Sequence, residues 1–184
     1  MAGSLIKVDE FTISSAVASV ILGGGSSGSS GLNASIDSTY DVYMVRFNNL
    51  VPATDGARIR LRVTKSGTAD TTANYDQAGK FIRTSTSFGN SSATNGTYFD
   101  MGTIGNATGE ENSWLLYLFN FNNASEYSFI TNEQVTLSNG AELRGLQGSG
   151  VHTVASASDG ISVSFDSGNI SSATCALYGL KKEV

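Results

Sequence analysis

The single histidine and the single cysteine are the first residues to test for chemistry, because acid–base and nucleophilic catalysis most often draw on these side chains. His152 lies in Gly150–Thr153, and Cys175 lies in the apolar stretch Thr174–Leu177. A Ser-His-Asp triad needs only one histidine, but no serine stands in a Gly-x-Ser-x-Gly elbow between a strand and a helix. We interpret His152 as a loop or strand-end residue. A lone cysteine excludes an intramolecular disulfide. Because Cys175 lies in an apolar stretch, we interpret it as a small buried hydrophobic residue.

The acidic and glycine-rich segments form no recognisable catalytic or metal-binding motif. Glu110 and Glu111 are adjacent, so on a strand they would point to opposite faces, whereas glycoside hydrolysis needs two carboxyl groups at a set separation. Gly102–Gly109 lacks the Lys-Ser/Thr ending and the following helix of a phosphate-binding loop. One His and one Cys are too few for a usual zinc site, and no Asp-x-Asp-x-Asp-Gly loop occurs, although a structural Ca²⁺ between loops stays open. The sequence therefore predicts no catalytic, cofactor-binding or metal-binding residues, and no enzyme.

The elements that would position these residues are strands. In Arg58–Thr64, three apolar residues alternate with three arginines, which is typical of a half-buried strand. We interpret Arg58, Arg60 and Arg62 as a solvated or inter-subunit face. Strand signals also occur at Phe11–Ile13, Val17–Leu22, Tyr40–Phe47, Trp114–Phe121, Tyr127–Thr131, Val135–Leu137, Ile161–Phe165 and Thr174–Leu180. Helical spacing is weak and confined to Thr71–Phe81. This pattern predicts an all-β fold, an antiparallel β-sandwich that is jelly-roll-like.

Turn-forming residues connect these strands. Asn139-Gly140 tolerates the positive φ of a tight turn and predicts a hairpin between Val135–Leu137 and Glu142–Leu146. The Gly/Ser-rich residues 23–31 have the composition of a flexible loop, and Ser85–Asn95 predicts a loop at one end of the sandwich. A chain of 184 residues favours one domain, so we expect a single β-sandwich over residues 1–184 with long Gly/Ser/Asn-rich loops.

The strand signal at Trp114–Phe121 is apolar on both faces. Leu115, Tyr117, Phe119 and Phe121 would share one face, and Trp114, Leu116 and Leu118 the other. This predicts a central strand that is covered on both sides, or one whose second face meets a neighbouring subunit. Such a strand makes an oligomer the expected state, with a sugar-stacking platform as the alternative.

Charge and hydropathy exclude two classes of partner. The net charge of −5 gives no general attraction for nucleic acid, whose binding depends on Lys and Arg. No apolar run approaches the roughly 20 residues that cross a bilayer, and no charged segment followed by an apolar one suggests a signal peptide. We expect a protein made in a reducing cytoplasm that binds neither nucleic acid nor membrane.

Four segments carry a resemblance to a known group of proteins. They are Ser4–Glu10, Ile36–Tyr43, Gly105–Glu110 and Ala176–Lys181. With them the chain resembles small, mostly uncharacterised proteins encoded by marine and cyanobacterial phages, over nearly its whole length apart from the Gly/Ser stretch at 23–31. The resemblance implies a virion component and transfers no site residue.

This resemblance leads to two expectations and one disfavoured alternative. The first is a non-enzymatic virion structural protein on the particle surface, a capsid (head) decoration protein that self-associates as a homotrimer and contacts other virion proteins such as the major capsid protein. The second is a tail-fibre or receptor-binding tip whose end loops, Ser85–Asn95 and Gly145–His152, contact host surface glycans. An enzyme such as a polysaccharide depolymerase is disfavoured, because the carboxylate and histidine arrangements are absent. The position on the virion, head or tail, stays open.

Overall fold

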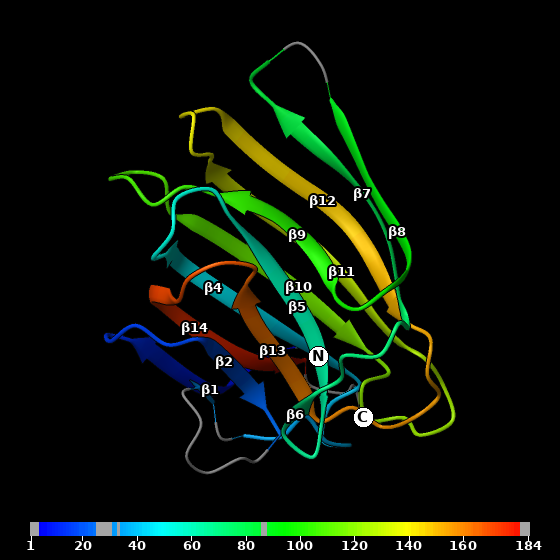
Figure 1. Ribbon diagram of the computed structural model, residues 1–184. Helices are drawn as coiled ribbons and strands as arrows, with labels where there is room; N and C mark the ends of the chain where they lie inside the picture. The colour runs from blue at the N-terminus through cyan, green and yellow to red at the C-terminus, as the bar shows by residue number, and fades with distance from the viewer. Residues whose placement is uncertain (1–3, 25–30, 33, 86–87, 181–184) are drawn as a thin grey trace.

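The computed structural model describes residues 4–24, 31–32, 34–85 and 88–180, and strands are its regular elements (Figure 1). In chain order the strands are β1 (Leu5–Ile13), β2 (Ser19–Gly23), β3 (Gly31–Leu32), β4 (Val42–Pro52), β5 (Ala57–Lys65), β6 (Thr68–Ala69), β7 (Tyr75–Arg83), β8 (Gly89–Gly96), β9 (Phe99–Ile104), β10 (Asn112–Phe119), β11 (Ser128–Leu137), β12 (Leu143–His152), β13 (Gly160–Phe165) and β14 (Ile170–Leu180). Within these ranges there is no helix long and apolar enough to cross a membrane.

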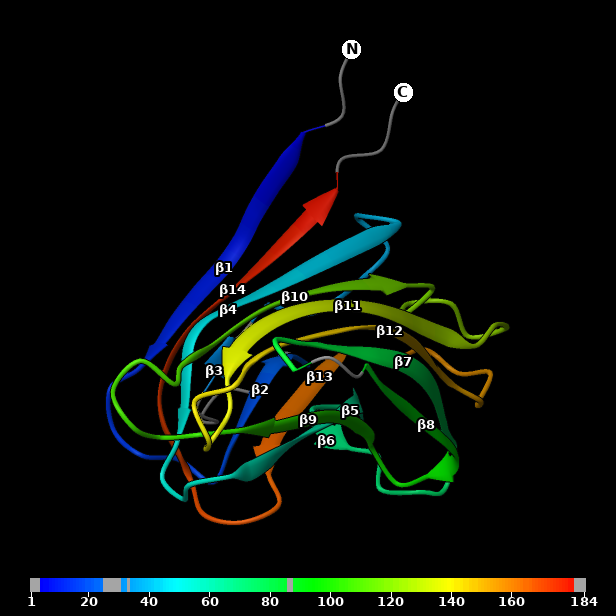
Figure 2. The same ribbon diagram turned by 90° about the horizontal axis from the view of Figure 1, so that it is seen from above.

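The strands form two sheets that lie one above the other, with the larger sheet arching over the smaller (Figure 2). The eight-stranded sheet has the order β1-β14-β4-β10-β11-β12-β7-β8. The six-stranded sheet has the order β3-β2-β13-β5-β6, and β9 also pairs with β5. Neighbouring strands are antiparallel except for β2 and β3. The all-β sandwich prediction is confirmed, whereas the jelly-roll topology is not.

The core fills the space between the two sheets. Trp114 of β10 is 1% exposed, and its ring stacks on Phe47 of β4 with 5.3 Å between centroids. Alternate residues of β10 and of β5 are buried on the two facing surfaces: Leu116, Leu118, Ile59, Leu61 and Val63. Burying these side chains removes apolar surface from water, which is the main force that holds the two sheets together.

Strand β10 confirms most of the predicted two-faced pattern. Leu115 and Tyr117 point away from the core, as expected for the second face. The placement of Phe121 on that face is wrong, because β10 ends at Phe119 and Asn120 takes a left-handed φ of 59°. The turn redirects Phe121 into the core, where it is 2% exposed.

Three segments that were predicted as loop or weak helix belong to strands. Thr71–Phe81 overlaps β7, Ser85–Asn95 overlaps the edge strand β8, and Gly145–His152 lies within β12. The glycines of β12 serve close packing rather than flexibility. A Cβ on Gly150 would lie 2.5 Å from the ring of Phe99, so only glycine fits there without displacement.

Two further predictions concern turns. The predicted hairpin is confirmed, with Leu137 of β11 paired to Leu143 of β12, but the positive φ of its turn lies at Ala141 rather than at Asn139 or Gly140. In the predicted Gly/Ser loop, Gly23 ends β2 and Gly31 begins β3, while residues 25–30 lie outside the described residues.

The arginine face of β5 is partly buried against its neighbours. Arg58 forms an ion pair with Asp100 of β9. The guanidinium groups of Arg60 and Arg62 lie over the ring of Tyr98, at 4.9 and 5.4 Å from its centroid. These contacts hold β9 and the segment before it against β5, so the three arginines have structural partners within the chain.

Candidate functional site

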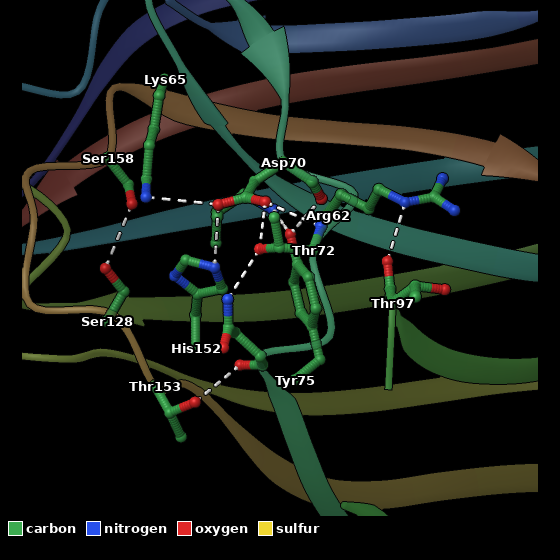
Figure 3. Close-up of polar contacts among 12 residues, drawn as sticks. Arg62, Lys65, Asp70, Thr72, Tyr75, Thr97, Ser128, His152, Thr153 and Ser158 are labelled. Atoms are coloured by element: carbon green, nitrogen blue, oxygen red, sulfur yellow. Dashed lines mark hydrogen bonds and ion pairs between the residues drawn. The ribbon is translucent and has the colours of Figure 1, made fainter. Parts of the chain in front are cut away.

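His152 lies in a polar cluster at the end of β12 (Figure 3). Its side chain is fully buried, and its Nε2 is 3.3 Å from Oδ2 of Asp70. The same oxygen is 3.2 Å from Nζ of Lys65, and the other oxygen of Asp70 accepts a hydrogen bond of 2.9 Å from the backbone N–H of Thr72. The prediction of a strand end for His152 is confirmed, and the fold brings to it an aspartate that lies far away in the sequence.

Electrostatics in this cluster favour a charged Asp70 and a neutral His152. Burial raises the pKa of Asp70, but hydrogen bonds from Thr72 and the Lys65 ammonium outweigh it and hold that pKa at about 2. Burial lowers the pKa of His152 below its ordinary value, and the attraction of Asp70 only partly opposes this effect. Burial also raises the pKa of Tyr75, whose hydroxyl donates a 2.6 Å hydrogen bond to the backbone carbonyl of Asp70.

The cluster contains the residue types of a Ser-His-Asp triad, but its serines are not accessible. Ser128 is paired with His152 across β11 and β12, and its hydroxyl lies 3.3 Å from that of Ser158. Ser128 and Ser158 are each 1% exposed and His152 is 0% exposed, so a substrate has no route to the hydroxyl in this conformation. The contacts of His152, Asp70 and Lys65 connect β12 to the segments around β5 and β6, so the cluster has a structural role.

The other residues considered from the sequence, Cys175, Glu110 and Glu111, form no reactive site. Cys175 is buried, its thiol lies 3.5 Å from the carbonyl oxygen of Phe11, and burial raises its pKa to about 12. A side-chain oxygen of Glu110 accepts a 3.0 Å hydrogen bond from the backbone N–H of Ala107, which closes the turn before β10, while Glu111 is exposed. In the described part of the chain, no group of three or more His, Cys, Asp or Glu side chains could hold a metal.

The outer face of the eight-stranded sheet, which points away from the six-stranded sheet, is the most extended candidate. Strand register arranges its residues in rows that cross β1, β14, β4, β10, β11, β12 and β7. The apolar row contains Leu5, Leu180, Val42, Phe119, Phe129 and Val151, and it ends at the acidic Asp76 on β7. The tyrosine row contains Lys7, Tyr178, Met44, Tyr117, Thr131, Ser149 and Ala78. The charged row contains Glu10, Ala176, Arg46, Leu115, Glu133, Gln147 and Lys80.

Several large apolar side chains on this outer face are open to solvent. Tyr117 is 40% exposed and Phe129 and Leu180 are each 44% exposed. Val42 and Phe119 lie between Leu180 and Phe129 in the apolar row, and Tyr117 lies in the next row, so these residues form a continuous patch. Contiguous apolar patches of this kind mark association surfaces in soluble proteins.

The outer face is uneven, because β12 contributes the small residues Gly145 and Ser149 to it. One hollow of about 460 Å³ includes Arg46, Leu115 and Glu133 in its lining, and Gly145 of β12 also borders it. A second hollow of about 400 Å³ is lined in part by Phe129. The face therefore has bulky side chains over β14 and β4 and a depression along β12.

Comparison of this chain with protein-family models, curated proteins and solved structures gives no match.

Proposed function

We propose that this chain is a non-enzymatic structural protein of a bacteriophage virion, displayed on the particle surface as a capsid decoration protein. The observation that carries the proposal is the apolar outer face of the eight-stranded sheet, on which Tyr117, Phe129 and Leu180 are exposed. Val42 and Phe119 connect Leu180 to Phe129 across the sheet. Covering such a face with another protein surface removes apolar area from water. Because four sequence segments resemble phage proteins, we propose that the partner surface belongs to a phage particle.

The chemistry of the interior supports a structural role. The buried His152 has a neutral side chain beside a charged, partly buried Asp70. The cysteine is buried with a raised pKa, so it is a weak nucleophile. A broad sheet face without a reactive group suits protein attachment better than it suits turnover of a substrate.

A receptor-binding tip on a tail fibre is the second candidate, and one hollow favours it. The hollow of about 460 Å³ combines the charged or polar side chains of Arg46, Glu133 and Gln147 with the apolar Leu115. Binding sites for small ligands commonly pair an apolar surface with a few polar groups in this way. A glycan bound by this protein would lie on the outer face beside β12, since Gly145–His152 forms a strand there rather than an end loop.

A cosedimentation assay separates these functions. Purified protein is mixed with phage heads that lack it and, separately, with intact host cells. The decoration proposal expects saturable, stoichiometric binding to heads, loss of binding in Tyr117→Asp, and unchanged binding in Asp55→Asn, which alters an exposed carboxylate on the β4–β5 connection. Binding to cells together with inhibition of phage adsorption supports the receptor-binding tip, and binding to neither overturns the virion assignment.

A further inference from the structure

We infer that the outer face is a self-complementary interface, which pairs two copies of this chain about a two-fold axis that runs along β10. The inference goes beyond the proposed function, because it takes a second copy of the chain as the partner that covers the outer face in solution. Docking on a capsid through the same face would displace that copy. It rests on the order of side chains in the three rows and on the uneven shape of the face.

The strand order determines which elements would meet. When two identical sheets pack face to face about an axis parallel to β10, strands on one side of β10 lie over strands on the other side in the partner. Strand β4 then faces β11, β14 faces β12, and β1 faces β7. Each row stays opposite itself, because the axis runs along the strands and the rows run across them. Such an isologous contact uses one patch twice and closes as a dimer.

Charges in the charged row are complementary under this operation. Arg46 and Glu133 flank Leu115 in the strand register, one on each side of β10. The two-fold axis therefore places Arg46 of each copy opposite Glu133 of the other. Further out, Glu10 on β1 meets Lys80 on β7 in the same way.

Among the described residues, Arg46 and Glu133 form no ion pair. The Nε of Arg46 is buried without a hydrogen-bond partner in the described ranges, and its guanidinium lies 5.7 Å from the ring centroid of Tyr178. Glu133 is exposed, and among the described residues it forms no ion pair. Opposite charges from a second copy would satisfy both groups, and complementary charges of this kind fix the register of an interface.

Shape and apolar character follow the same symmetry. In the tyrosine row, the bulky Tyr178 of β14 would face the small Ser149 of β12, where the outer face is depressed. In the apolar row, Val42 would face Phe129, and Phe119 on β10 would meet its own copy. Side chains on β14 and β4 of one copy thus meet smaller or apolar side chains on β12 and β11 of the other copy.

The face is large enough for a stable dimer. Strand β10 has 8 residues and is about 26 Å long at about 3.3 Å per residue. Seven strands spaced about 4.8 Å apart span about 29 Å measured along the curved sheet, so the outer face offers more than the roughly 600 Å² per partner that the smallest specific interfaces bury. A homotrimer would instead need two different patches that meet head to tail, so the symmetric order of the rows favours a dimer over the expected trimer.

Charge reversal tests the inference directly. Sedimentation velocity and native mass spectrometry of the full chain at micromolar concentration should give twice the 19.2 kDa mass of one copy. Arg46→Glu and Glu133→Arg should each weaken dimerisation at least about 100-fold, because each puts two like-charge pairs into the interface. The Asp55→Arg control, on the exposed β4–β5 connection, should remain dimeric.

A mixture of the two reversed variants gives the decisive readout. Combining Arg46→Glu protein with Glu133→Arg protein should restore a mixed dimer, since both charge pairs then join opposite signs. Restoration also demonstrates that each variant is folded. A wild-type monomer or trimer, dimers that survive either reversal, or a mixture that stays monomeric would each overturn the inference. Head binding by a monomeric wild type would leave the virion proposal standing and reject only this one.

Discussion

Replacing Asp70 by asparagine should destabilise the protein at neutral pH through the loss of one buried charge. The carboxylate of Asp70 is paired with Lys65 at 3.2 Å and accepts hydrogen bonds from Thr72, and only 11% of its side chain is exposed. Its pKa is about 2 in the folded protein, against an ordinary value of 3.8. At about 1.4 kcal/mol for each pH unit, the charged form contributes about 2 kcal/mol to the free energy of unfolding at pH 7.5.

The sign of the pH dependence follows from the lowered pKa. Because the folded state holds this proton less tightly than the unfolded state, the contribution is present above pH 4 and is lost as the pH falls towards about 2. The wild type and Asp70→Asn should therefore differ by about 2 kcal/mol at pH 7.5, and the difference should shrink below about pH 4. A pH of 7.5 also keeps His152 uncharged in both states, since its folded pKa lies below 6.5.

Urea unfolding followed by the fluorescence of Trp114, the only tryptophan, measures this difference. Trp114 is buried between the sheets, so its emission reports loss of the core. Asp55→Asn removes an exposed carboxylate as a matched control and should change stability by less than about 0.5 kcal/mol. Equal unfolding midpoints for the wild type and Asp70→Asn at pH 7.5 would refute the reasoning.

Three further predictions concern the core, the two faces of β10 and acid stability. Gly150→Ala should lower the free energy of unfolding by about 1–3 kcal/mol, because the added Cβ would collide with Phe99. Adding Phe99→Leu should recover part of that loss in urea unfolding, and additive effects of the two substitutions would contradict the collision. Leu116→Ala should lower the free energy of unfolding by about 2–5 kcal/mol in the same assay, because Leu116 is buried in the core. Leu115→Ala, on the outer face, should change monomer stability by less than about 1 kcal/mol and should weaken self-association. Equal losses of stability in the two variants would contradict the assignment of faces. Stability should decline as the pH falls below 6.5, because burial lowers the folded-state pKa of His152 and the unfolded state binds the proton first; a flat profile of urea midpoints from pH 7.5 to 5 argues against it.

The sequence predicted the fold class well where side chains alternate in strict period two. Arg58–Thr64 lies within β5, and the apolar run from Trp114 became the central strand β10. Period two is visible in the sequence because one face of each strand must enter the core. The end of β10 was missed, since the left-handed φ of Asn120 that redirects Phe121 has no sequence signal stronger than asparagine itself.

Sequence reasoning failed where strands are made of glycine and small polar residues. Gly145–His152 was predicted as a loop from its composition, but β12 is paired on both sides and its glycines are required by close approach of neighbours. A Cβ on Gly148 would lie 2.8 Å from the carbonyl oxygen of Ala78, a constraint that exists only after β7 and β12 are paired. Tertiary packing, rather than local preference, selects glycine at such positions.

The two candidate sites differ in how far the sequence revealed them. The apolar second face of β10 was predicted from Leu115 and Tyr117, and with it the expectation of a neighbouring subunit. The pairing of His152 with Asp70 was not predicted, because the two residues lie in different segments and no local motif links them. Only the fold places the end of β12 against the residues that follow β6.

A cryo-EM map of virions from a phage that encodes this chain is the most direct test of the central claim. The proposal predicts density for this two-sheet domain on the capsid surface at local symmetry axes, in copies that match its stoichiometry in the particle. Density confined to the tail would replace decoration by receptor recognition. Virions without any density for the domain would contradict the assignment to the particle.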